Sequence, residues 1–314
     1  MFAARCMGIS LAVFVLTYGL VSMVVGASWR ITLRVFQPST SRGKADLLFL
    51  LRVFPLISGL AISLGLALPS FLLLEPRSTD EAVGHAPVVL AIVFVAFAVW
   101  GLWSAAQAQR RTSRAIEQWL RDSTRLDSGE GVPVFRSHRR SPTLTVAGVC
   151  APKVIVSDEA ASALTAAELR TALRHEMAHV RRYDNLKKLI FRLAMFPGTA
   201  ALEAAWSEQT ELAADDAAVT DIDEALDLAS ALIKISRLGA VSTKVEFTTA
   251  LLHSSTALAM RIHRLFAWSG KKSPASVRAY AAAFSFLGVF VLGLVSTYNS
   301  LLGGMHQLTE WLVR

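Results

Sequence analysis

Four long stretches without aspartate, glutamate, lysine or arginine constrain this chain most strongly. A helix that crosses the hydrocarbon core of a bilayer needs roughly 20 predominantly apolar residues, and each stretch exceeds that length. Four such stretches seldom occur as buried core helices of one soluble fold, so we expect four membrane-spanning helices. The stretches are Cys6 to Ser28, Val53 to Leu74, Ala82 to Gln109 and Ala279 to Thr309.

The composition agrees with a membrane protein, because 53% of the residues are hydrophobic and only 18% are charged. The alternative for the first stretch is a cleaved signal peptide. Its apolar run is longer than the roughly 7 to 15 residues of a signal core, which favours an anchor. The two cysteines, Cys6 and Cys150, lie in a predicted span and in a predicted aqueous segment. They indicate neither a disulfide framework nor a cysteine metal site.

The net charge of +8 predicts topology. Arginine and lysine crowd the loop after the first stretch, whereas acidic residues dominate the next loop, so the positive-inside rule places the first loop in the cytosol. Basic residues flank the segment 110–278 on both sides, which places it in the cytosol and both termini outside. We expect three spans in 1–109, a cytosolic domain in 110–278 and a fourth span with a short external tail in 279–314. No nucleic-acid-binding motif accompanies the charge, so direct binding of DNA or RNA is not expected.

The cytosolic segment is predicted to mix strands and helices, whereas the whole chain is mainly α. Residues 110–126 have the pattern of an amphipathic helix next to the membrane. Residues 186–197 are apolar but too short to span, and are expected to pack under the active site or dip into the interface. Strands are predicted at 132–135, 144–149 and 153–156, and longer helices at 165–184, 199–219 and 221–238.

The stretch from Thr165 to Asp184 carries the main motif, T-A-A-E-L-R-T-A-L-R-H-E-M-A-H-V-R-R-Y-D. Thr165 and Glu168 have the spacing of a capping box, which predicts the start of a helix. On that helix His175 and His179 lie one turn apart on the same face, where both can ligate a metal ion. Glu176, in the H-E-x-x-H pattern between them, suits a general base. The plainer interpretation is two ordinary histidines on a helix.

An acidic cluster on a later predicted helix, Glu208 to Asp216, supplies candidates for the remaining roles. A catalytic zinc site needs three protein ligands and an open position, so Glu211 is the predicted third ligand of Zn²⁺. Asp215, on the same face, is the predicted acceptor for the other nitrogen of a ligating histidine. Asp184 either accepts from an imidazole or closes the end of the helix. The alternative for the cluster is a solvated acidic face.

These roles together predict hydrolysis of peptide bonds, because a zinc ion with an adjacent carboxylate base activates water. The predicted strand at 144–149 is a candidate for binding an extended protein substrate by strand addition.

Three segments resemble the BlaR/MecR-type membrane metallopeptidase family. They are S-P-T-L-T-V-A-G-V-C-A-P-K-V-I-V at 141–156, L-T-A-A-E-L-R-T-A-L-R-H-E-M-A-H-V-R-R-Y-D-N-L at 164–186 and E-L-A-A-D-D-A-A-V at 211–219. The similarity covers about residues 90 to 265. It implies a four-span protein with a cytosolic, zincin-like α+β protease domain, in which His175, His179 and Glu211 bind zinc and Glu176 is the base.

The chain departs from the family pattern in two ways. Thr210 stands where the family commonly has a basic residue, and the external penicillin-binding sensor domain is missing, so a direct β-lactam receptor is not expected. Signalling by cleavage of a cytosolic transcriptional repressor, with a separate sensor protein, is one expected use. Quality control of membrane proteins is another. A non-catalytic membrane signal transducer that retains the zinc fold is the alternative to an enzyme.

Overall fold

A computed structural model describes residues 2–75, 84–126, 132–138, 141–238, 248–250, 255–270, 293 and 296–310. Over these residues the chain is mainly helical with one small mixed sheet, which confirms the expected balance of helix and strand. The larger helices are α1 (Phe2–Phe36), α2 (Ser41–Ile62), α4 (His85–Leu120), α6 (Ala166–Arg181), α8 (Ala200–Ala218) and α9 (Ile222–Arg237). The shorter helices are α3 (Leu68–Leu74), α5 (Asp158–Ala163), α7 (Asp184–Leu193) and α10 (Ser255–Phe266).

Three of the described helices are long and apolar enough to cross a membrane: Phe2–Phe36, Ser41–Leu74 and His85–Leu120. The second joins α2 to α3 through a π-helical turn at Ser63–Ala67. Large apolar side chains stand exposed along all three, among them Leu20, Leu64 and Val95. An apolar surface of this extent is typical of contact with lipid. The first two helices contain the first two predicted stretches, and the third contains residues 85–109 of the third stretch.

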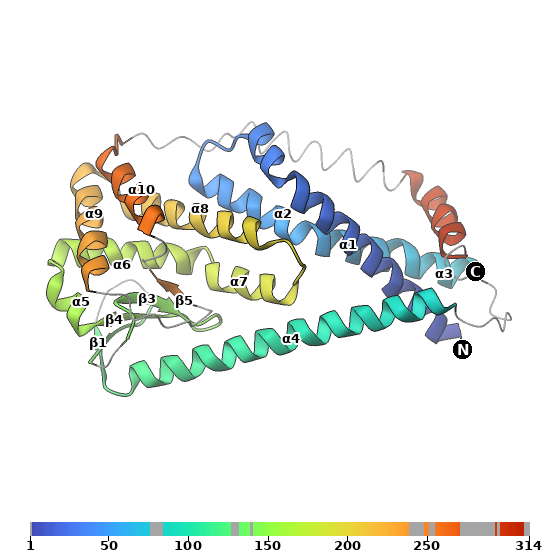
Figure 1. Ribbon diagram of the computed structural model, residues 1–314, viewed down its shortest axis with the longest axis horizontal. Coiled ribbons are helices and arrows are strands. Elements are labelled where there is room, and N and C mark those ends of the chain that lie inside the picture. The colour runs from blue at the N-terminus through green and yellow to red at the C-terminus, as the bar shows by residue number, and fades with distance from the viewer. Residues whose placement is uncertain are drawn as a thin grey trace.

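Most of the fourth predicted span, Ala279 to Thr309, lies outside the described residues. The structure does describe the end of this stretch, where residues 296–310 form a helix. Tyr298 Oη donates a hydrogen bond to the Gly65 carbonyl at 2.8 Å, and Met305 packs against a cluster from α1 and α3. This segment therefore lies beside α3, at the same end of the molecule as the start of α1 (Figure 1).

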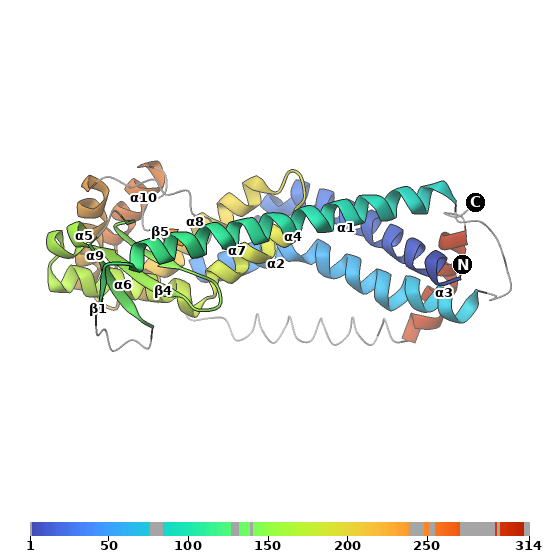
Figure 2. The same cartoon turned by 90° about the horizontal axis from the view of Figure 1, so that it is seen from below.

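The sheet lies at the opposite end of the elongated molecule (Figures 1 and 2). Its strand order is β1-β2-β4-β3-β5, with β2 and β4 parallel and the other pairs antiparallel. The strands are β1 (Ser123–Leu126), β2 (Val134–Ser137), β3 (Leu144–Ala147), β4 (Lys153–Ser157) and β5 (Thr248–Ala250).

The central strand β4 is apolar on both faces, because helices cover both. Val154 and Val156 belong to a core cluster that includes side chains of α6 and α9. Ile155, which points to the other face, packs with Ala115 and Trp119 of α4. This alternation is the period-2 geometry of a strand, and it places the sheet between the end of α4 and the pair α6 and α9.

Local sequence signals set the limits of α6. Thr165 Oγ1 accepts from the Glu168 amide at 3.2 Å, and Glu168 Oε2 accepts from the Thr165 amide at 2.7 Å, so the predicted capping box is present. The helix ends before Tyr183, whose φ of 56° lies in the left-handed region. That turn starts α7 at Asp184, directly beside the face of α6 that carries the histidines.

One continuous helix, α4, links the apolar end to the sheet. The helix predicted at 110–126 is present in part: residues 110–120 form the last turns of α4, whereas Ser123–Leu126 form β1 instead of its end. The expected domain boundary at residue 109 falls within this helix. Helix α4 contacts α7 closely at Gly101, where an added Cβ would lie 2.9 Å from the backbone oxygen of Leu193. The absence of a side chain at Gly101 permits this approach.

We expect the substitution Gly101→Ala to destabilise the protein by about 1 to 3 kcal/mol, because the added methyl group meets backbone rather than a movable side chain. The matched control is Gly26→Ala in α1, where an added Cβ meets nothing within 4 Å. Thermal unfolding of the purified protein in detergent micelles, followed by near-UV circular dichroism, measures the difference. Equal apparent melting temperatures for the two variants would contradict the close contact.

Candidate metal centre

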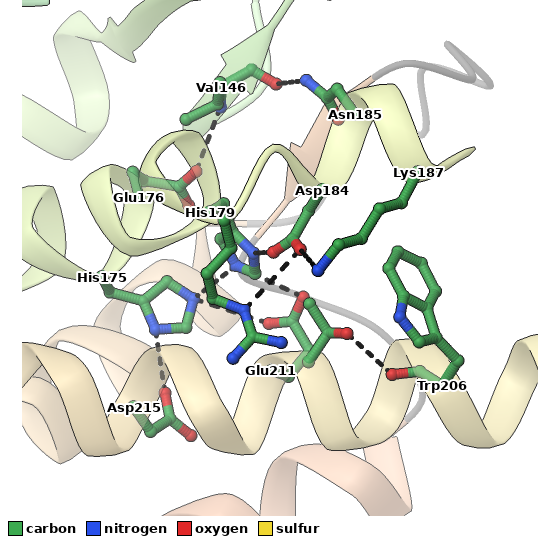
Figure 3. Close-up of polar contacts among 12 residues, drawn as sticks. Val146, His175, Glu176, His179, Asp184, Asn185, Lys187, Trp206, Glu211 and Asp215 are labelled. Carbon is green, nitrogen blue, oxygen red and sulfur yellow. Dashed lines mark hydrogen bonds and ion pairs between the residues drawn. The ribbon is translucent and has the colours of Figure 1, made fainter. Parts of the chain in front are cut away.

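The two motif histidines and Glu211 converge between α6 and α8 (Figure 3). His175 Nε2 and His179 Nε2 are 3.2 Å apart. Glu211 Oε2 lies 3.5 Å from His175 Nε2, and Glu211 Oε1 lies 3.6 Å from His179 Nε2. All three residues are buried, with 0%, 2% and 5% of their surfaces exposed for His175, His179 and Glu211 respectively.

These spacings fit a metal ion. Ligand atoms at 2.0–2.1 Å from a tetrahedral metal are about 3.3 Å from one another, and the three measured separations are close to that value. Two neutral imidazoles and one carboxylate are ligands that divalent transition metals accept. The structure therefore brings together a buried group that could hold a metal ion, contributed by two helices that are far apart in the sequence.

A second group of potential ligands, Glu75, His306 and Glu310, lies at the other end of the molecule. It is less suited to a metal ion. Arg5 already lies 3.3 Å from Glu75, and the Glu310 side chain is half exposed. A nearby guanidinium offsets the charge that would attract a cation, so the buried group is the better candidate.

Each histidine also meets a carboxylate at its other ring nitrogen. Asp215 Oδ1 lies 2.9 Å from His175 Nδ1, and Asp184 Oδ2 lies 2.8 Å from His179 Nδ1. Such partners hold the proton on Nδ1 and leave the Nε2 lone pair for a metal. Of the two roles considered for Asp184, the geometry therefore favours the contact with the imidazole, although the residue also begins α7.

The carboxylate of Glu176 is buried beside the histidines and contacts the sheet. Its Oε2 accepts a hydrogen bond from the backbone amide of Val146 in β3 at 3.0 Å. Asn185, at the start of α7, donates to the Gly148 carbonyl at 3.0 Å and so ties α7 to the end of the same strand. The Glu176 bond holds β3 against the face of α6 that carries the motif, and Figure 3 also shows a longer contact, 3.5 Å, from Asn185 to the Val146 carbonyl.

The strand-addition hypothesis for β3 is contradicted by the order of the sheet. Residues Thr145 to Ala147 pair with β4 on one side and with β5 on the other, so β3 has no open edge there. The sequence does not predict β5, because three residues are too few to give a strand pattern.

Arg261 of α10 is a component of the site that the sequence did not reveal. Its Nε and Nη2 donate to the two carboxylate oxygens of Asp215 at 2.8 and 2.7 Å, and its Nη1 lies 3.0 Å from Glu211 Oε2. Only 3% of its surface is exposed. In the sequence, Arg261 is one of the basic residues that precede the predicted fourth span. Its spacing in an amphipathic segment gave no indication of burial.

The electrostatic balance of the site follows from these contacts. Burial alone would lower the pKa of His175, but the contacts with Asp215 and Glu211 raise it to about 9 in the metal-free chain. Burial would raise the pKa of Asp215, and Arg261 together with His175 lowers it to about 2. The pKa of Glu211 also falls well below its usual value, because His179 and Arg261 outweigh burial. The carboxylates are therefore ionised at neutral pH, as metal ligation requires.

Comparisons with known proteins add no assignment, since neither a protein-family model nor a curated protein matches the chain. The function must therefore be argued from the site itself.

We expect Asp215→Asn to weaken the binding of a divalent ion by about 10-fold to 100-fold, because the orienting carboxylate of His175 is lost. Asp216→Asn is the matched control: its side chain is 39% exposed and pairs with Arg264 instead. Competition with a chelator, with Zn²⁺ as the probe ion, gives both affinities. Equal affinities for the two variants would contradict the assigned role of Asp215.

A second prediction concerns Arg261, whose replacement leaves two buried carboxylates without their guanidinium partner. We expect Arg261→Met to destabilise the metal-free protein by about 3 to 5 kcal/mol, and added Zn²⁺ to reduce that loss by supplying positive charge. Arg264→Met is the control, since Arg264 is 40% exposed. Thermal unfolding with and without the ion measures both effects. An equal loss in both variants would exclude the neutralising role.

Proposed function

We propose that the protein is an integral membrane zinc endopeptidase. One observation carries the proposal: His175, His179 and Glu211 meet at metal-binding distances with the carboxylate of Glu176 buried on the same helix. Two histidines and one glutamate, with a further glutamate next to the first histidine, form the residue set of thermolysin-type catalytic zinc sites. The resemblance to the BlaR/MecR-type family supports the same assignment.

Zinc is the metal that this ligand set suits best, since imidazole and carboxylate ligands in a three-residue set are typical of its catalytic sites. A zinc ion in such a site acts as a Lewis acid that polarises a carbonyl group and lowers the pKa of water to about 7. His175, His179 and Glu211 would hold it. Asp215 and Asp184 would orient the two imidazoles through their Nδ1 atoms.

Glu176 is the proposed general base. The hydrogen bond from the Val146 amide holds Oε2 at 3.0 Å and fixes the orientation of the carboxylate. In the proposed reaction Glu176 takes a proton from the attacking water and delivers it to the nitrogen of the leaving amine. A single carboxylate can perform both transfers because the proton that it gains in the first is the one that it gives up in the second.

The membrane placement of the enzyme rests on charge. The positive-inside rule places the domain in 110–278 in the cytosol of a cell-membrane protein whose N-terminus and C-terminus are outside. The three long apolar helices support contact with a lipid bilayer. The proposed substrate is a protein in the cytosol or in the membrane. Repressor cleavage under the control of a separate sensor protein is the use that we favour.

The substitution Glu176→Gln should retain stoichiometric zinc and lower peptide cleavage by about 10²-fold to 10⁴-fold, because the base is lost while the ligands remain. Glu208→Gln, an exposed carboxylate on α8, is the matched control and should cleave like the wild type. Metal analysis and cleavage of a denatured protein substrate by the purified protein test both statements. Equal cleavage by wild type and Glu176→Gln would exclude the proposed mechanism.

The same variant can identify the biological substrate. Proteins that remain bound to Glu176→Gln in cells, but not to wild type, are candidate substrates. A transcriptional repressor among them supports signalling, whereas misfolded membrane proteins support quality control. Bound zinc without any cleavage by the wild type would favour a non-catalytic transducer.

A further inference from the structure

The carboxylate of Asp184 is divided between two kinds of partner. Its Oδ2 lies 2.8 Å from His179 Nδ1. Its Oδ1 faces two cations instead, since Arg182 Nε and Lys187 Nζ each lie 3.7 Å from it. In Figure 3, Asp184 lies between His179 and Lys187. Because Asp184 is fully buried, the partners of Oδ1 affect the charge with which Oδ2 holds the imidazole.

The same two cations also contact a carboxylate of an apolar helix, α2. Asp46 Oδ1 lies 3.5 Å from Arg182 Nη2 and 3.7 Å from Lys187 Nζ. Asp46 is in the second turn of α2, whereas Asp184 begins α7, so the two carboxylates come from segments that are far apart in the sequence. Arg182 and Lys187 are therefore shared between a residue of the metal site and a residue of α2.

The guanidinium of Arg182 is not committed to either carboxylate. Its side chain is 10% exposed. Within the part of the chain that the structure describes, its Nε, Nη1 and Nη2 atoms have no hydrogen-bond partner. A buried guanidinium beside a carboxylate ordinarily donates hydrogen bonds to it. At 3.5 Å from Asp46 and 3.7 Å from Asp184, the group is held by charge from both sides, so its balance depends on where Asp46 lies.

This balance bears on the metal site through His179. A carboxylate at the second nitrogen of a ligating imidazole raises the basicity of that ligand. Each cation that pairs with Asp184 offsets part of the negative charge that does so. Asp46 attracts the same cations and therefore leaves more of that charge to act on His179.

We infer that Asp46 is a positioning residue of the candidate metal centre. It shares Arg182 and Lys187 with Asp184, and in this way it strengthens the hold of the site on a zinc ion. Because α2 is part of the long apolar helix Ser41–Leu74, the contact makes the affinity of the site depend on the position of that helix. The inference rests on the proposed zinc site and adds to it a control of its affinity from α2.

The affinity of the full chain for Zn²⁺ in detergent micelles, measured by competition with a chelator, tests the inference. Asp46→Asn removes the carboxylate of α2, and Asp46→Glu keeps its charge. Lys187→Met removes one shared cation and keeps an unbranched side chain. Arg42→Gln is the matched control, because Arg42 is 78% exposed and pairs with Asp46 within α2, at 3.8 Å. Lys188, which also interacts with Asp184, is unchanged in all variants.

We expect Asp46→Asn to weaken Zn²⁺ binding by about 3-fold to 10-fold and Lys187→Met to strengthen it by a similar factor. The factors are smaller than for a direct partner of the imidazole, because both residues act through Asp184. Opposite directions are a result that general damage to the fold would not give. Asp46→Glu and Arg42→Gln should stay within about 2-fold of the wild type. In an Asp184→Asn background, Asp46→Asn should have no further effect.

Equal affinity of Asp46→Asn and the wild type would overturn the inference, as would weakening by both Asp46→Asn and Lys187→Met. An undiminished effect of Asp46→Asn in the Asp184→Asn background would also overturn it, because the charge of Asp46 would then act without Asp184. A wild-type protein that binds no Zn²⁺ would refute the proposed function and this inference together. Tight binding by the wild type with unaltered variants would refute this inference alone, so the two failures are distinguishable.

Discussion

The burial of charged side chains around His175 is the constraint on which the half of the molecule that carries the sheet depends. Removing an ion from water costs several kcal/mol unless a partner compensates for it. Here Glu211 and Asp215 of α8 are compensated by Arg261 of α10 and by the histidines of α6. The ion pairs that compensate these buried charges join side chains of different helices. Their mutual position is therefore set by pairing as well as by the apolar core between them and the sheet.

The parts of this arrangement that could be predicted from the sequence are the local ones. The capping box at Thr165 and Glu168 acts within one helical turn, so the pattern alone located the start of α6. The spacing of His175 and His179 follows from helix geometry in the same way. The prediction of Glu211 as third ligand requires that α8 lie against the histidine face of α6. The structure places the Glu211 carboxylate beside both histidines, as that prediction requires.

The parts that could not be predicted depend on pairing between distant segments. Arg261 resembles a surface arginine near a predicted span, and only the fold shows that it is buried against Asp215. The amide of Val146 has no side-chain signal that would mark it as the partner of Glu176. The edge of β3 was expected to be open because β5 is too short to be recognised. In each case the information lies in a contact between residues that are far apart in the sequence.

The helices α7 and α8, which carry residues of the candidate metal site, also connect it to the long apolar helices. Phe191 of α7 and Trp206 of α8 pack in one cluster with Ala45 and Leu48 of α2. The hydroxyl of Thr210 donates a hydrogen bond to the backbone carbonyl of Trp206. Thr210 directly precedes Glu211, the candidate metal ligand. Thr210, where the resembled family commonly has a basic residue, thus bonds within its own helix. Because protein interiors are close-packed, a shift of α2 or α4 relative to α8 would be transmitted to the ligand by contact. A movement of these apolar helices therefore has a direct physical route to the candidate metal centre, through side chains that are already in contact.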